Sequence, residues 1–130
     1  MDDVAGRVLQ AVEGGAAAMV AEIAGLVQVP SVSGSDAEND AQQLLADRLR
    51  RTGLEVDHWR IDLEELQRHP DFPGMEVERR EAWGLVGRLT GAGDGPTLML
   101  NGHIDVVPTG DLEAWDVSPF AATQRAGRLF

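Results

Sequence analysis

Residues 97–108 constrain the fold more than any other stretch, because there an apolar run leads into a turn that carries a histidine and an aspartate. The run at 97–101 has the composition of a strand, and a glycine and a proline bound the turn that follows. In an extended backbone residues two positions apart point the same way, so His103 and Asp105 share a face while Ile104 points into the core. The pattern predicts a metal site, in which the imidazole gives one ring nitrogen to the metal and the carboxylate accepts the proton on the other.

Two amphipathic helices are predicted in the first half of the chain. Apolar residues at three- and four-residue spacing predict a helix over residues 4–26, before Val29 and Pro30. Ser35 and Glu38 form a Ser-x-x-Glu capping box ahead of a second helix, which Gly53 ends. A short helical turn is predicted at 62–66. The apolar face of the second helix is formed by Ala41, Leu44, Leu45 and Leu49.

Strand patterns alternate with these helices. Apolar residues separated by polar ones predict a strand over 54–61, and further strands are predicted over 83–89 and 97–101. The glycine-rich residues 90–96 predict a hairpin-type connection between the last two strands. Residues 111–130 are predicted to be mostly loop, with a strand at the end. The alternation of helix and strand predicts an α/β fold.

The motif around the predicted metal ligand resembles that of a known family. Leu98-Met-Leu-Asn-Gly-His-Ile-Asp-Val-Val-Pro108 is similar to the first metal motif of the zinc amidohydrolases and exopeptidases, which include acetylornithine deacetylase, succinyl-diaminopimelate desuccinylase and aminoacylase. Weaker similarity covers Val29-Pro-Ser-Val-Ser33 and Trp83-Gly-Leu-Val-Gly-Arg88. The downstream positions that match the family pattern of G, W, PF and G-x-L/F are Gly110, Trp115, Pro119-Phe120 and Gly127-Arg-Leu129.

The resemblance implies a fold and a set of roles. It implies that residues 1–130 are the N-terminal, incomplete portion of a metal-dependent catalytic domain, a partial three-layer sandwich with a mixed sheet between helices, without the lid and dimerisation domain. His103 is the implied ligand of one of two zinc ions, with cobalt or manganese possible instead. Asp105 is the implied catalytic-site carboxylate, which does not bind the metal itself but holds the ligand His103 in place. The general base and the remaining ligands are implied to follow Phe130.

The implied activity is hydrolysis of the amide bond of an N-acyl amino acid or short peptide, with a homodimer possible for the intact enzyme. Three readings stay open: a deacylase or peptidase fragment that is inactive by itself, a non-catalytic binding or assembly module, and one half of a split enzyme. Asp105 has an alternative role as well, because an aspartate can cap a turn through its own backbone.

Other polar features have structural interpretations. His58 and His69 have no carboxylate partner at ligand spacing and are interpreted as solvated or structural. The glycine-rich stretch 91–95 leads into a predicted strand and not into a helix, so we expect a turn there and not a phosphate loop. The charged run at 76–81 is expected to be a solvated connection.

Composition excludes several classes of protein. The formal net charge of −11 argues against nucleic acid or an anionic membrane as a partner, because phosphate contacts need clustered cations. The chain has no cysteine, so a metal would be held by imidazole and carboxylate groups. The apolar runs are shorter than a membrane span and the Met-Asp-Asp start is acidic, so a cytoplasmic location is expected.

Overall fold

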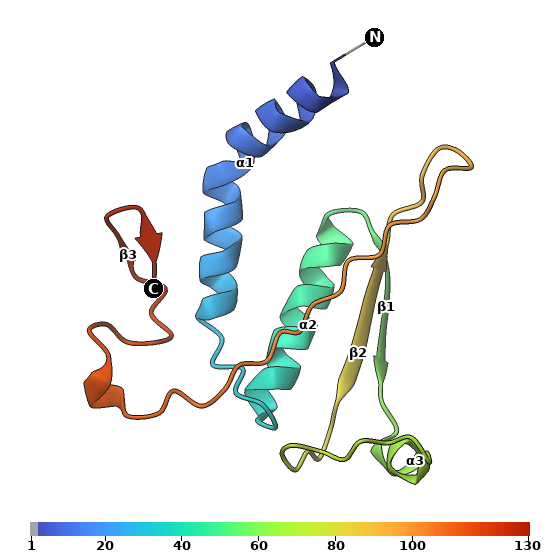
Figure 1. Ribbon diagram of the computed structural model, residues 1–130, viewed down its shortest axis with the longest axis vertical. Coiled ribbons are helices and arrows are strands. Elements are labelled where there is room, and N and C mark those ends of the chain that lie inside the picture. The colour runs from blue at the N-terminus through green and yellow to red at the C-terminus, as the bar shows by residue number, and fades with distance from the viewer. Residues whose placement is uncertain (1–2) are drawn as a thin grey trace. The chain divides into compact units, whose positions relative to one another are not determined.

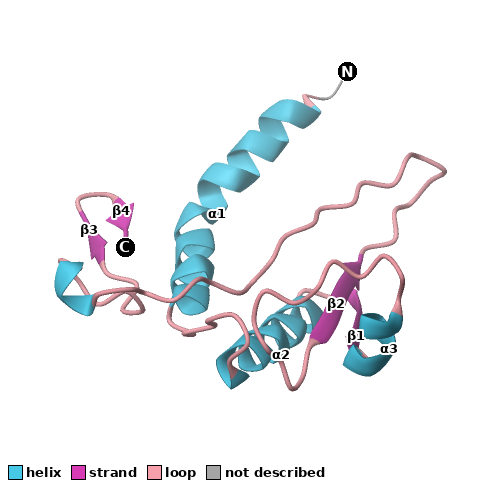
Figure 2. Cartoon of the chain, turned by 60° about the horizontal axis from the view of Figure 1, so that its bottom comes forward, coloured by secondary structure: helices cyan, strands magenta, loops and turns pink. Residues whose placement is uncertain are grey.

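The computed structural model describes residues 3–130, which divide into two units (Figure 1). One unit combines residues 3–29 with residues 109–130, and the other contains residues 30–108. Helices and strands alternate along the chain (Figure 2), so the predicted α/β class is confirmed.

The first unit contains α1, Val4–Val27, which confirms the predicted first helix. Its N-terminus is capped by Asp3, whose carboxylate accepts a hydrogen bond of 2.8 Å from the backbone N–H of Gly6. No residue of α1 is buried, and between 38% and 57% of each large apolar side chain is exposed at Val4, Val8, Val12, Met19, Val20 and Ile23. The predicted helix is therefore present, and these apolar side chains stay more than a third exposed.

By length and composition α1 could cross a membrane. Core helices of soluble proteins and N-terminal signal sequences meet the same criterion, so the helix does not decide between these cases. The expected absence of a membrane partner stays a prediction.

The C-terminal part of the first unit is mostly loop, as predicted. A single 3-10 turn, η1, spans Leu112–Ala114. It is followed by a two-stranded antiparallel hairpin of β3, Gln124–Arg125, and β4, Arg128–Leu129. The tight connection has Ala126 and Gly127 at positive φ, and it confirms the predicted strand at the end of the chain.

In the second unit, α2, Asp36–Arg51, packs against an antiparallel pair of strands, β1, Glu55–Arg60, and β2, Trp83–Arg88 (Figure 1). Gly87 of β2 makes this close packing possible, because a Cβ there would lie 3.2 Å from Leu49 of α2 and 2.9 Å from Leu54. Gly53 ends α2 with φ of +82°, as predicted. The fully buried side chains of α2 are small, with Ala41 1% and Ala46 0% exposed. The core of this unit is thin.

The antiparallel register of β1 and β2 pairs Trp59 with Gly84 and His58 with Leu85. The Trp59 ring covers Gly84, where an added Cβ would overlap the indole at 2.2 Å. The short helix α3, Leu63–Arg68, follows β1 and begins at Asp62, whose carboxylate accepts from the N–H of Glu65. The predicted strands at 54–61 and 83–89 and the helical turn at 62–66 are therefore confirmed within two residues at each end.

The predicted strand at 97–101 is wrong. The structure has no strand between β2 and η1, and that stretch is drawn as loop in Figure 2. The partner of β2 is β1, so the residues at 90–96 do not connect a hairpin. A strand is defined by its hydrogen-bonded neighbour. The described residues supply none at 97–101, and Leu98, Met99 and Leu100 are 80%, 84% and 87% exposed.

The predicted capping box is only half right. Ser35 is the N-cap residue of α2, but its side chain makes no capping hydrogen bond, and its hydroxyl is buried without a hydrogen-bond partner. Glu38 does not reach back to Ser35. Its carboxylate instead accepts a hydrogen bond of 2.6 Å from the backbone N–H of Gly34, one residue earlier. The backbone N–H of Ser35 donates instead to the Val32 carbonyl, at 3.0 Å, and Glu38 also binds Arg79, a contact that local sequence does not reveal.

Candidate functional site

The loop that carries His103 and Asp105 is fixed to the segment before α2. Val106 and Val32 form an isolated parallel bridge, in which Val106 N–H donates to Ser31 and Ser33 N–H donates to Val106, each at 3.0 Å. The buried Ser31 hydroxyl adds a hydrogen bond of 2.9 Å to the carbonyl of Ile104. Residues 31–33, more than 70 residues earlier in the sequence, therefore hold the loop of the predicted ligand in an extended form.

His103 is held through one ring nitrogen. Its Nδ1 lies 3.0 Å from the backbone oxygen of Asp105 and 3.1 Å from Asp105 Oδ1. Both oxygens are hydrogen-bond acceptors, so in the neutral imidazole Nδ1 carries the hydrogen and Nε2 keeps its lone pair. The imidazole side chain is 85% exposed. The exposed side chain can therefore offer the lone pair of Nε2 to a metal ion from the solvent side.

Asp105 uses its two oxygens differently. Oδ1 faces His103, whereas Oδ2 accepts a hydrogen bond of 2.6 Å from the Ser33 hydroxyl and lies 3.7 Å from a guanidinium nitrogen of Arg79. The Ser33 hydrogen bond lowers the pKa of Asp105, partial burial opposes this, and the contact with His103 lowers it further. Asp105 is thus an ionised acceptor at neutral pH. It touches the imidazole, as the sequence predicts for a carboxylate that orients a ligand.

The prediction of a solvated connection at 76–81 is wrong for Arg79, which is partly buried. Its guanidinium donates to both carboxylate oxygens of Glu38, at 3.1 and 2.7 Å. The side chains of Arg79 and Glu38 are only 22% and 18% exposed. Part of this charged run is therefore packed between α2 and the ligand loop and is not a solvated link.

The other two histidines lack this arrangement. His58 stacks on Trp83 with ring centroids 4.6 Å apart, and its Nε2 is buried without a partner, so it is structural. The expectation that His69 lacks a carboxylate at ligand spacing is wrong, because Asp71 follows two residues later with Oδ2 4.0 Å from Nδ1. However, His69 accepts a hydrogen bond at Nδ1 from the backbone N–H of Asp71, at 3.2 Å. In the neutral imidazole of His69 the hydrogen is consequently on Nε2, which is the opposite tautomer to that of His103.

The donor set does not amount to a complete metal centre. Within residues 3–130 no three His, Cys, Asp or Glu side chains gather closely enough to hold a metal ion. A catalytic zinc site usually has three protein ligands. His103 and its carboxylate partner fit one ligand position of such a centre, and the rest would have to come from elsewhere.

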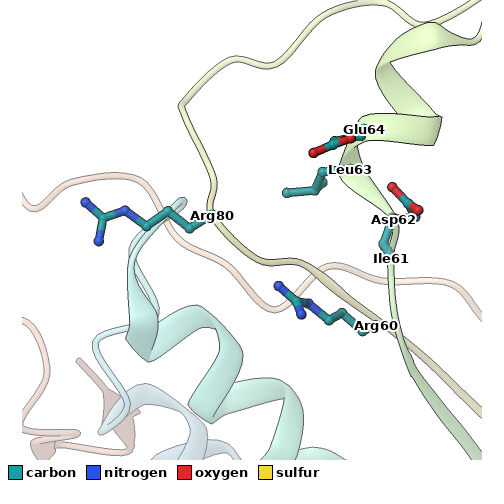
Figure 3. Close-up of a pocket in the computed structure, with 6 residues that line it drawn as sticks. All are labelled: Arg60, Ile61, Asp62, Leu63, Glu64 and Arg80. Atoms are coloured by element: carbon teal, nitrogen blue, oxygen red, sulfur yellow. The ribbon is translucent and has the colours of Figure 1, made fainter.

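A pocket of about 490 Å³ lies away from these residues, where β1 leads into α3 (Figure 3). In Figure 3 two guanidinium groups extend from different segments, and two carboxylates lie beside the start of α3. Neither His103 nor Asp105 lines it. Its lining residues are Arg60, Ile61, Asp62, Leu63, Glu64 and Arg80.

No family model matches the chain. Three curated proteins named succinyl-diaminopimelate desuccinylase do match 81% of it. The protein from Leptothrix cholodnii is 38% identical over 105 residues, and the one from Delftia acidovorans is 40% identical over 106 residues. The protein from Acinetobacter baumannii is 34% identical over 106 residues. Over about four-fifths of its length the chain is homologous to the succinyl-diaminopimelate desuccinylases.

The resemblance to this deacylase family, inferred from the motif at 98–108, is thereby confirmed. The chain spans under a quarter of the length of these desuccinylases, 22–23%. Sequence analysis found the pair His103 and Asp105 but not the side chains that hold Asp105. Ser33 lies 72 residues from its partner in sequence, so no local spacing points to the contact. The only signal was that Ser33 falls in a segment similar to the family.

Proposed function

We propose that this chain is part of the catalytic domain of a metal-dependent deacylase, in which His103 binds one metal ion through Nε2 and Asp105 orients the imidazole. The observation that carries the proposal is the pair of acceptor oxygens at Nδ1, which fix the tautomer with Nε2 exposed. Imidazole ligands in metal sites typically donate their second N–H to a carboxylate or a carbonyl in this way. Homology to proteins named desuccinylase supports the same reaction class.

The proposed metal is zinc, in a pair of ions as the resemblance implies, with cobalt or manganese as substitutes. When bound, such an ion polarises an amide carbonyl and makes its water more acidic. The part that this chain plays is limited to binding and orientation. His103 offers a neutral nitrogen, and Asp105 holds the imidazole hydrogen on Nδ1, away from the metal position. The general base is proposed to lie outside residues 1–130.

The proposed substrate is an N-acyl amino acid or a short peptide, and an N-succinyl amino acid is the first choice because the relatives are named for desuccinylation. The catalytic domain is proposed to be a three-layer sandwich, in which α2 with the β1–β2 pair is one part. A homodimer and a cytoplasmic location are proposed for the complete protein. The net charge of −11 supports a small-molecule partner over a nucleic acid.

The test is hydrolysis of an N-succinyl amino acid by the product of the complete reading frame, with and without zinc. We expect zinc-dependent release of succinate that His103→Ala reduces by at least a hundredfold. His69→Ala is the matched control, because His69 is also an exposed histidine beside an aspartate but has the opposite tautomer. Equal loss in both variants, or full activity of His103→Ala, would contradict the proposal.

A further inference from the structure

Two side chains outside the His-x-Asp motif, those of Ser33 and Arg79, converge on one oxygen of Asp105. We infer that Ser33 and Arg79 are positioning residues of the candidate metal site, which fix the Asp105 carboxylate so that Oδ1 faces His103. The inference rests on the proposed function of His103. It assigns a role to two residues that the motif at 98–108 does not contain.

The two carboxylate oxygens of Asp105 have different partners. Ser33 Oγ donates to Oδ2 at 2.6 Å, and a guanidinium nitrogen of Arg79 lies 3.7 Å from the same atom. Oδ1 is left to His103 Nδ1, at 3.1 Å. A carboxylate with one oxygen fixed can no longer rotate freely. The hydroxyl of Ser33 therefore places the carboxylate acceptor of the imidazole, beside the backbone oxygen of Asp105 that Nδ1 also contacts at 3.0 Å.

Arg79 is itself held in place. Both of its bonds to Glu38 are short, at 2.7 and 3.1 Å, and Glu38 accepts a further hydrogen bond from the Gly34 N–H. Charge-assisted hydrogen bonds of this kind are stronger than neutral ones, and salt screens them less when the groups are partly buried. The exposed fractions of Asp105, Arg79 and Glu38 are only 26%, 22% and 18%. The row from Glu38 through Arg79 to Asp105 therefore links the start of α2 to the ligand loop.

The backbone is shaped to bring Arg79 this close. Gly34 has φ of +81°, and a Cβ there would lie 2.9 Å from the Glu78 carbonyl oxygen and 3.0 Å from Val77. A larger residue would therefore push the segment that carries Arg79 away from the loop of Ser33. The close contact between these two segments therefore depends on glycine at position 34.

Removal of either positioning residue should loosen the imidazole without unfolding the unit. Ser33→Ala leaves Oδ2 with the guanidinium alone, and Arg79→Gln removes the charge and leaves Glu38 with the Gly34 N–H but without its cationic partner. Loss of a group that holds a metal ligand from behind typically costs about 10–100-fold in metal affinity or activity. We expect a loss in that range for each variant.

The experiment uses the product of the complete reading frame with its histidines labelled with ¹⁵N. At a pH where the imidazoles are neutral, the nitrogen shifts of His103 report which ring nitrogen carries the hydrogen. Zinc affinity and separate values of kcat and KM for an N-succinyl amino acid are measured on the same proteins. Ser33→Thr keeps the hydroxyl and Arg80→Gln removes a neighbouring charge that has no described contact with Asp105, so these two are the matched controls.

We expect wild type and both controls to show hydrogen on Nδ1 of His103, and Ser33→Ala and Arg79→Gln to show a mixture of tautomers. The same two variants should bind zinc at least about tenfold more weakly and lose kcat with little change in KM. Wild-type tautomer and zinc affinity in both variants would overturn the inference. If Ser33→Ala does not fold, as judged by circular dichroism, the Arg79→Gln result decides.

Failure of the proposed function gives a different result. A wild-type protein that neither binds zinc nor hydrolyses the amide would contradict the proposed function. The nitrogen shifts would still support or refute the control of the His103 tautomer by Ser33 and Arg79, because they require neither metal nor substrate.

Discussion

The exposed run Leu98, Met99 and Leu100 is expected to limit the stability of this chain. These side chains are 80%, 84% and 87% exposed, although their sequence is that of a buried strand. Burying one such side chain fully stabilises a protein by about 1.5–3 kcal/mol, so covering all three is worth about 4–8 kcal/mol after their present burial is allowed for. That amount approaches the whole stability of a typical domain, about 5–15 kcal/mol.

We therefore predict that residues 1–130 alone bind the dye ANS strongly and show no cooperative thermal transition. Replacement of all three residues by serine should lower ANS binding of the isolated chain. In the intact protein, where we expect this run to be covered, the same replacement should reduce the free energy of unfolding by about 4–8 kcal/mol in urea. Ala92→Ser, in the exposed loop just before the run, is the control and should change neither quantity.

A sharp two-state melt of the isolated wild-type chain, with a monomeric mass and no ANS binding, would refute this reasoning. It would show that the exposed run needs no cover and would favour a stand-alone binding module over part of a longer catalytic domain. An unchanged urea midpoint for the serine variant of the intact protein would refute it in the same way.

The remaining predictions concern the site and its supports. The lowered pKa of Asp105 means that its ionised form stabilises the fold above the unfolded pKa, and that this contribution disappears as pH falls through the lower folded pKa. Urea midpoints of the intact protein between pH 2 and pH 6 should therefore fall at the acid end less steeply in Asp105→Asn than in wild type. Gly34→Ala combines a φ of +81° with a contact of 2.9 Å to the Glu78 carbonyl oxygen, and should cost about 2–4 kcal/mol in the same assay. A loss below about 0.5 kcal/mol would show that the loop is not packed as described. Calorimetry on residues 1–130 alone should show weak zinc binding that His103→Ala barely changes, because one imidazole cannot close a site; nanomolar binding lost in that variant would contradict this.

Features set by local sequence were predictable. The helix at 4–26 follows from the spacing of its apolar residues, and the end of α2 follows from Gly53 with its positive φ. The strand at 54–61 carries an alternating apolar pattern, and the run at 83–89 has the composition of a strand. Each of these is marked by residues that are close in the chain, which a pattern can report, although the two strands also need each other as hydrogen-bonded neighbours.

Features that depend on distant partners were not predictable. Residues 97–101 have strand composition, but a strand needs a hydrogen-bonded neighbour and the described chain offers none. Glu38 caps Gly34 and also binds Arg79, 41 residues away, while the Ser35 N–H that a capping box would use donates to Val32. The contact of Ser33 with Asp105 likewise has no counterpart in spacing. Sequence therefore identified the candidate ligand and its carboxylate, while the groups that hold the carboxylate came only from the structure.

The central claim is that His103 binds a metal ion through Nε2 while Asp105 holds Nδ1. Crystals of the intact protein grown with zinc, measured at the zinc absorption edge, test it directly. We predict an anomalous peak about 2.0–2.1 Å from His103 Nε2, with Nδ1 still within hydrogen-bond distance of Asp105. A zinc peak that lies elsewhere while Nε2 faces solvent, or one bound to Nδ1, would contradict the claim.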